Sequence, residues 1–222
     1  TKAEEDARAA AVLRNIERVL RRRAADFVGL HETQQILDDV ELSLPATVRN
    51  VIPKPITLPV LADVLRRLLE EHVSIRDMRS ILEALSSIGP HEKDPLQLTE
   101  FVRAAQKRAI TYELTQGASA ISVVTLDPII EDSVRRAITR TPAGSFLSLS
   151  PVIGRDLLTA IGRAVNAQTE SRVILTQPDV RRFIRKLIET ELPDVVVISF
   201  AELLPETSIR EAARADLVGI GD

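Results

Sequence analysis

The residues best suited to metal binding are spread thinly along this sequence. Its three histidines are His31, His72 and His91, and the chain has no cysteine. A zinc site needs such ligands at short spacings within a helix or a turn, and no two of these histidines stand at one. We therefore predict no metal-ligating residue, and we expect the histidines to be exposed or to lie near helix ends.

Three polar residues stand directly before prolines, where short strands are predicted to end. They are Asp127, Ser150 and Gln177. If they converged at one edge of a sheet, a small α/β enzyme would be a reasonable hypothesis. However, a polar residue followed by proline is typical of a helix N-terminus, and a phosphate cradle needs glycine at such turns. We predict no catalytic residue and no cofactor-binding residue.

A second hypothesis is a transcription regulator that joins a helix-turn-helix part to an α/β sensor part. The helix-turn-helix would lie around residues 73–85, where the basic side chains are Arg76 and Arg79. Acidic residues surround them, and the whole chain carries a formal net charge of −3. Because DNA binding depends on cations that meet the phosphates, we expect no nucleic-acid partner.

The composition favours an aliphatic core. The chain is 45% hydrophobic but only 3% aromatic. Apolar residues recur at helical spacing from residue 4 to residue 112, with Thr57 and Pro59 marking one helix start and Ser74 another. No apolar run reaches the roughly 18–20 residues that a membrane-spanning helix needs.

The pattern changes after about Ala118. Short runs rich in β-branched residues alternate with amphipathic stretches, and strands are predicted at 123–126, 146–149, 173–176 and 195–199. We predict an α+β fold of several subdomains: an N-terminal helix (1–28), a helical subdomain (29–112), a small α/β subdomain built from strand-proline-helix units (113–210) and a flexible tail (211–222).

Several stretches resemble one family, the large export-gate proteins of type III secretion systems (the SctV/FlhA family). In chain order they read FVGLHETQ at 27–34, VSIRDMRSILEAL at 73–85, KDP at 93–95, TPAGSFL at 141–147 and VILTQPDVR at 173–181. The first and fourth are closer to the virulence (injectisome) branch than to the flagellar branch.

The resemblance implies a protein with an N-terminal membrane domain and a cytoplasmic domain of four subdomains. This chain resembles the end of the first subdomain followed by the third and the fourth. Family members form a nonameric ring at the cytoplasmic face of the bacterial inner membrane. The ring meets the stalk protein of the ATPase, the gatekeeper and chaperone–substrate complexes. The implied role is a ring-forming docking platform for protein export, without enzymatic activity and attached to the membrane only through the missing domain.

Residues 74–85 provide our candidates for an oligomer interface. Arg76, Asp77, Arg79 and Glu83 display both signs of charge beside an apolar face. Unlike charges of this kind can pair across a contact between copies in a ring.

Overall fold

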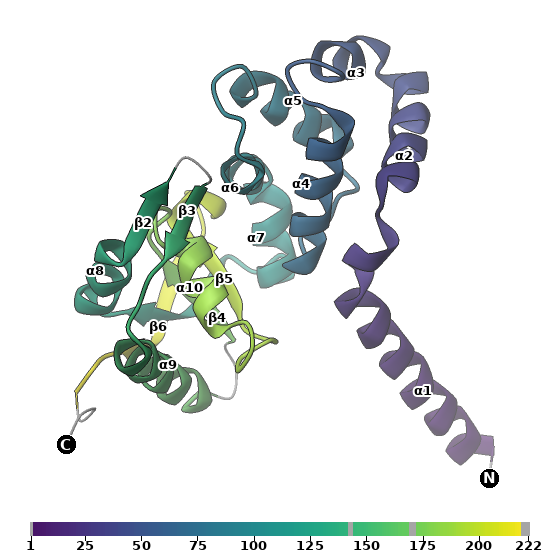
Figure 1. The fold of residues 1–222 in the computed structure, drawn as a ribbon. Coiled ribbons are helices and arrows are strands. Elements are labelled where there is room, and N and C mark those ends of the chain that lie inside the picture. The colour runs from purple at the N-terminus through teal and green to yellow at the C-terminus, as the bar shows by residue number, and fades with distance from the viewer. Residues whose placement is uncertain (1, 142–143, 169–171, 219–222) are drawn as a thin grey trace. The chain divides into compact units, whose positions relative to one another are not determined.

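The protein is described here by a computed structural model that covers residues 2–141, 144–168 and 172–218 (Figure 1). Pro142 and Ala143 of the fourth motif, and residues 219–222 of the predicted tail, lie outside the described residues. The chain divides into two compact units, Thr1–Gln106 and Lys107–Asp222. We call them unit 1 and unit 2.

Every regular element in the described part of unit 1 is a helix. Its elements are α1 (Lys2–Arg22), the 3₁₀ helix η1 (Ala24–Phe27), α2 (Leu30–Ser43), α3 (Pro45–Val51), α4 (Leu58–Glu70), α5 (Met78–Ile88) and α6 (Pro95–Ala105). This confirms the predicted N-terminal helix and the helical region that follows it.

Helix α4 forms the centre of the unit 1 core. Thr57 precedes it in an extended conformation and Pro59 occupies its first turn, where proline loses no hydrogen bond. Its buried side is fully aliphatic and consists of Leu61, Ala62, Val64, Leu65 and Leu68. The opposite side of the helix is charged. On one flank α4 packs against η1 and α2, and on the other it packs against α6.

Helix α5 begins later than the sequence indicated. Its first residue is Met78, and Asp77 is the N-cap. Ser74 lies outside the helix, and its hydroxyl accepts a hydrogen bond from the backbone N–H of Arg76. The prediction of a helix start at Ser74 is therefore wrong. Both serine and aspartate can cap a helix, so the sequence pattern did not choose between them.

A close approach of the backbone marks the end of α5. Gly89 follows the helix, and a Cβ at this position would lie 2.6 Å from the carbonyl oxygen of Leu85 and 2.9 Å from Ile56 Cδ1. The Lys93 ammonium then donates to the carbonyl oxygens of Pro55 and Gly89. Together these contacts fasten the loop before α4 to the end of α5.

Unit 2 is an α/β unit. Its elements are α7 (Lys107–Thr115), β1 (Ala120–Leu126), α8 (Pro128–Arg136), β2 (Ile138–Thr141), β3 (Gly144–Leu147), α9 (Pro151–Asn166), β4 (Val173–Thr176), α10 (Arg181–Ile188), β5 (Val196–Ser199), η2 (Phe200–Glu202) and β6 (Ser208–Ala215). The predicted combination of a helical part with a small α/β part is confirmed.

The main sheet of unit 2 has the order β5-β4-β1-β6, and every neighbouring pair is parallel. A cluster of buried apolar residues joins the sheet to α8, α9 and α10, with Val124, Ile174 and Val197 contributed by three adjacent strands. Short strands that alternate with helices give this parallel arrangement.

Two parts of unit 2 form strand pairs that the sequence did not predict. The strand around Phe146 is not in the main sheet: β3 pairs with β2 as an antiparallel hairpin. The region predicted as a tail from residue 211 instead continues β6, an edge strand paired along its length with β1. Its small alanines fit this place, because Ala215 is buried in the core cluster against which Ala213 packs.

Two of the three strand-proline-helix units have the expected caps. The Asp127 carboxylate accepts the N–H of Ile129 at 2.9 Å, and the Ser150 hydroxyl accepts the N–H of Ile153 at 3.3 Å. The third unit is different. After Gln177-Pro178 the chain makes a turn, and α10 starts only at Arg181 with Val180 as its N-cap. The prediction that Gln177 caps this helix is wrong.

Candidate interaction surface

The candidate interface residues gather around the start of α5 and are all exposed. Arg76 and Asp77 precede the helix, and Arg79 and Glu83 lie one turn apart on it. The other side of α5 is buried through Met78, Ile81, Leu82, Ala84 and Leu85. Burial of this side fixes the orientation of the helix, so that Arg79 and Glu83 project toward solvent. We call these four residues the α5 charge group.

Asp77 differs from the other three members. One of its carboxylate oxygens accepts the Ser80 N–H at 3.1 Å, and the other accepts the Ser80 hydroxyl at 2.6 Å. These two hydrogen bonds hold the pKa of the Asp77 carboxyl below its ordinary value. Asp77 therefore stabilises the helix terminus, and Arg76, Arg79 and Glu83 remain the members suited to contact another molecule.

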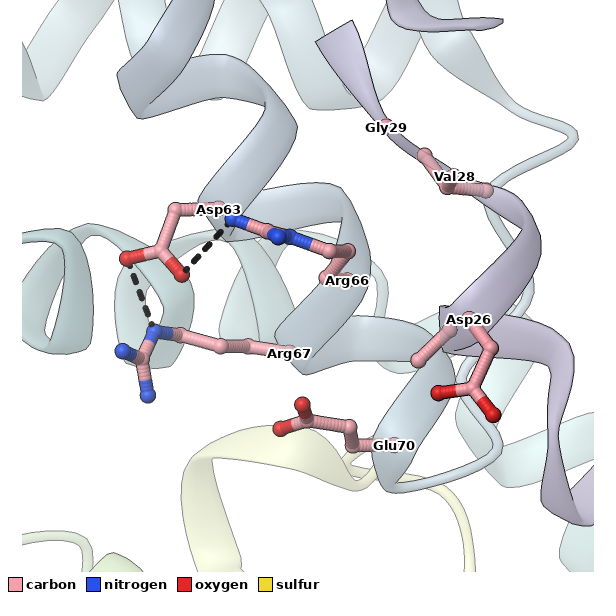
Figure 2. A pocket seen from close by; sticks show the side chains of 8 residues that line it. Asp26, Val28, Gly29, Asp63, Arg66, Arg67 and Glu70 are labelled. Carbon is pink, nitrogen blue, oxygen red and sulfur yellow. Dashed lines mark hydrogen bonds and ion pairs between the residues drawn. The ribbon is translucent and has the colours of Figure 1, made fainter.

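A second charged feature of unit 1 was not predicted from sequence. A pocket of about 400 Å³ lies between η1 and α4 (Figure 2). Residues Ala25–Asp26 and Val28–Gly29 line one side, and Asp63, Arg66, Arg67 and Glu70 line the other. We call it the α4 pocket.

Charges within the α4 pocket are only partly paired. Asp63 lies between two guanidinium groups, 3.1 Å from Arg67 Nε and 3.8 Å from Arg66 Nη2 (Figure 2). Asp26 pairs with Arg23 at 3.2 Å. Glu70 is exposed and has no ion pair with any described residue. Partial desolvation of its carboxyl nevertheless raises its pKa. The pocket thus offers one carboxylate, that of Glu70, to a cation from outside.

The sequence signal for this pocket is the spacing of charges along α4. Asp63, Arg66, Arg67 and Glu70 recur three, four and seven residues apart, which places them on one side of a helix. The opposite, aliphatic side of α4 was recognised as core. What the sequence lacks is any sign that η1 lies beside this charged side.

The residues considered for catalysis serve as parts of the unit 2 framework. Asp127 and Ser150 cap α8 and α9. The Gln177 backbone N–H donates to Glu131, which also accepts from the Thr176 hydroxyl at 2.6 Å. Glu131 thereby ties α8 to the end of β4.

Each histidine occupies a separate place. His31 lies in the first turn of α2, His72 follows α4 with a φ of 59°, and His91 follows α5. In the residues covered by the structure, no three His, Asp or Glu side chains form a group that could hold a metal ion. No helix within residues 2–218 has both the length and the apolar character to cross a membrane, as far as those residues are described.

A helical unit followed by this parallel α/β unit is the architecture of known cytosolic domains from the type III secretion export apparatus. The structure of the Chlamydia pneumoniae CdsV protein superposes with a TM-score of 0.89 and 39% identity, over 93% of this chain and 60% of that one. CdsV in its complex with CdsO gives a TM-score of 0.87 at 39% identity, and the match covers 93% of this chain and 62% of that one. The nonameric EscV cytosolic domain gives a TM-score of 0.78 at 33% identity, and the match covers 88% of this chain and 58% of that one.

The sequence agrees with the fold. The family description FHIPEP matches residues 5–208, and this chain belongs to the FHIPEP family. The hypersensitivity response secretion protein HrcV of Ralstonia nicotianae is 44% identical over 195 residues, 85% of this chain. The flagellar biosynthesis protein FlhA of Bacillus subtilis is 29% identical over 212 residues, 94% of this chain. The chain is thus more similar to injectisome members than to the flagellar one, which confirms the predicted branch.

The chain corresponds to a fraction of its relatives. It spans 28% of the length of HrcV and 31% of the length of FlhA. Activities and partners of the whole relatives therefore enter below as proposals.

Proposed function

We propose that this chain is the ring-forming part of a type III secretion export gate. It would act at the cytoplasmic face of the bacterial inner membrane, as a docking platform for proteins that are to be exported. The observation that carries this proposal is the match to the nonameric EscV cytosolic domain, with a TM-score of 0.78 over 88% of this chain. The proposed assembly is a homo-oligomeric ring, a nonamer by analogy with that relative.

A second proposal concerns the partners of the ring. CdsV was solved in complex with CdsO, and this chain superposes on that CdsV at 39% identity. We infer that a stalk protein of the ATPase contacts this chain in a comparable way. The gatekeeper and chaperone–substrate complexes are further partners implied by the family resemblance.

The role we propose is one of assembly and docking, without catalysis. Asp127 and Ser150, the residues best placed for chemistry by sequence, are engaged in helix caps. The regulator hypothesis is not favoured, because the fold and family both correspond to an export gate. By family analogy we assign residues 1–28 to the end of the first cytoplasmic subdomain, 29–112 to the third and 113–210 to the fourth.

A segment exchange tests this function. The matching 195 residues of Ralstonia HrcV, 44% identical to this chain, are replaced by the corresponding residues of this chain. We expect the chimeric gate to support secretion of the native substrates into the medium. A matched chimera with the Arg103→Ala change, which removes a buried cation, provides a folding-defective control. If the intact chimera accumulates in membranes at normal levels and secretes nothing, the proposal is wrong.

A further inference from the structure

The described part of unit 2 contains two sheets, and each has two edge strands. The four-stranded sheet ends in β5 and β6, and the other sheet is the hairpin of β2 and β3 (Figure 1). An edge strand leaves a row of backbone N–H and C=O groups unpaired, so another extended chain can pair with it unless something blocks the edge. The four edges of unit 2 differ in how they are blocked.

Two arginines of α10 close the outer edge of β5. Val196 donates its N–H on the side of β4, so the backbone groups of Val195 and Val197 point away from β4. On that outer side the Arg185 guanidinium donates to the carbonyl oxygen of Val195 at 2.8 Å. The Arg181 guanidinium donates to the carbonyl oxygen of Val197 at 3.2 Å. The acceptors that a further strand would need are therefore occupied.

Charged side chains block two other edges. Arg210, Glu211 and Arg214 are exposed along β6, whose register against β1 also shifts in the middle of the strand, as at a β-bulge. Charges and bulges both hinder the pairing of an edge with another chain. Edge β2 carries the exposed Arg140.

The outer edge of β3 is open. Ser148 donates its N–H to the carbonyl oxygen of Ala137 at 2.8 Å, and this bond extends the hairpin by one residue pair. Because backbone groups alternate in direction along a strand, those of Phe146 also face β2, and those of Ser145 and Leu147 point away from the hairpin. Ser145 and Leu147 are only partly buried, and no described residue forms a hydrogen bond with their backbone groups.

The chain around β3 is uncharged and well anchored. No charged side chain occurs from residue 141 to residue 154. Ile138 and Leu147 pack against the buried apolar cluster of unit 2 and hold the hairpin in place. Phe146 is 53% exposed and lies opposite Thr139 in the hairpin. A third strand along β3 would place one of its side chains beside the Phe146 ring, as cross-strand neighbours lie in a sheet.

We propose that the outer edge of β3 binds an extended, uncharged segment of a protein that is to be exported. The segment adds a third strand to the hairpin through hydrogen bonds to Ser145 and Leu147, with an apolar side chain beside Phe146. Main-chain hydrogen bonds supply affinity that depends little on sequence, which suits a platform that docks more than one protein. Resting on the docking function proposed above, this contact assigns that function to a named strand.

Peptide binding provides the first test. The probe is a fluorescein-labelled peptide of about seven residues that alternates threonine and valine, and fluorescence anisotropy measures its binding to the full chain. Phe146→Lys places a charge on the edge strand, and we expect it to weaken binding by about tenfold or more. Ile209→Lys makes the same change at an exposed position of β6 and should leave the affinity within about twofold. Equal effects of the two variants, or no binding to the unmodified chain, would overturn the proposal.

Methylated peptides test whether the contact uses the backbone. N-methylation of every second residue removes the donors from one edge of an extended peptide, and methylation of the remaining residues removes those of the opposite edge. We expect one methylated peptide to bind within about threefold of the probe and the other to lose about tenfold or more, since only one edge faces β3. Equal affinities of the two would show that no strand is added to the hairpin.

Amide hydrogen exchange locates the contact on the chain. Saturating probe should slow exchange of the Ser145 and Leu147 N–H groups by about tenfold or more, because both gain an acceptor. Exchange at Ile209 should not change. Protection on β6 without protection on β3 would contradict the proposal. So would a dimer of the chain that Phe146→Lys abolishes, because β3 would then be a contact between copies.

Secretion by the HrcV chimera separates this contact from the proposed function. Phe146→Lys in the chimera should lower secretion, while Ile209→Lys should not. If the F146K chimera secretes as much as the unmodified chimera, the β3 contact is wrong and the proposed function stands. If the unmodified chimera secretes nothing although the chain binds the probe, the proposed function is wrong instead.

Discussion

The guanidinium of Arg181 and the carboxylate of Glu202 form an ion pair in the interior of unit 2. Arg181 Nε lies 3.4 Å from Glu202 Oε1, and the exposed fractions of the two side chains are 1% and 2%. Arg181 also donates to the carbonyl oxygen of Val197 in β5 at 3.2 Å. The ion pair thereby joins the start of α10 to η2, and the hydrogen bond to Val197 joins it to β5.

Removal of one partner from this pair should destabilise unit 2 strongly. We expect Arg181→Met to cost about 3–5 kcal/mol of unfolding free energy, because it removes the guanidinium that pairs with the buried Glu202 carboxylate. The double variant R181M/E202L should be closer to the original chain, since no charge remains to be buried. The single tyrosine, Tyr112 in α7, reports on unit 2 by fluorescence during urea unfolding. Equal losses in the single and double variants would show that the pair is not coupled.

The N-cap of α5 makes a separate contribution to unit 1. Asp77→Ala removes both hydrogen bonds to Ser80 and should lower the stability of unit 1 by about 1 kcal/mol. Asp77→Asn should cost much less, because asparagine is also a good N-cap. Far-UV circular dichroism in urea measures both variants. If D77A unfolds at the same urea concentration as the original chain, Asp77 does not stabilise the helix terminus.

Acid should remove this contribution. The pKa of Asp77 is lower in the folded chain than its ordinary value of 3.8, so its stabilising effect is present above that value. The effect is lost as the pH falls through the lower folded pKa. The stability difference between the original chain and D77N should therefore shrink below about pH 4. A difference that stays constant from pH 6 to pH 2.5, or grows in acid, would contradict the assignment.

Alanine substitutions at two glycines should have opposite effects. At Gly89 the new methyl would meet the Leu85 carbonyl oxygen at 2.6 Å, and we expect a loss of about 1–3 kcal/mol. Gly162 lies inside α9, and apart from its chain neighbours and the nearby backbone of the helix itself, no atom stands within 4 Å of a Cβ at this position. Gly162→Ala should therefore gain about 0.5–1 kcal/mol through lower backbone entropy of the unfolded chain. Thermal unfolding checks both, and a stabilised G89A would contradict the described packing at the end of α5.

Local patterns predicted those parts of the fold that depend on local physics. The aliphatic stripe of α4, the caps at Asp127 and Ser150, and the strands β1, β4 and β5 were all visible in the sequence. Each of these follows from periodicity or from the hydrogen-bonding needs of a helix start.

Features that depend on distant partners were missed. The alanines of β6 have low strand propensity, and they form a strand because β1 offers its edge. The hairpin partner of the strand at Phe146 was also not predicted, because the composition of a strand does not reveal which strand it pairs with. In the candidate surface, the α5 charge group was named from sequence, whereas the α4 pocket requires η1 beside α4.

The apolar stripe of α1 shows the same dependence on context. Its residues Val12, Leu13, Ile16, Val19 and Leu20 have helical spacing but are between 49% and 66% exposed. Periodicity predicted the helix correctly, and it carries no information about what packs against it.

The mass of the chain as a function of concentration tests the ring most directly. Sedimentation equilibrium and native mass spectrometry should show growth from one copy to a single closed species of high order, with a limit that further concentration does not change. Such a limit is the signature of head-to-tail contacts that close. A stable dimer with two-fold symmetry, or a strict monomer up to the highest concentration reached, would contradict ring formation by this chain.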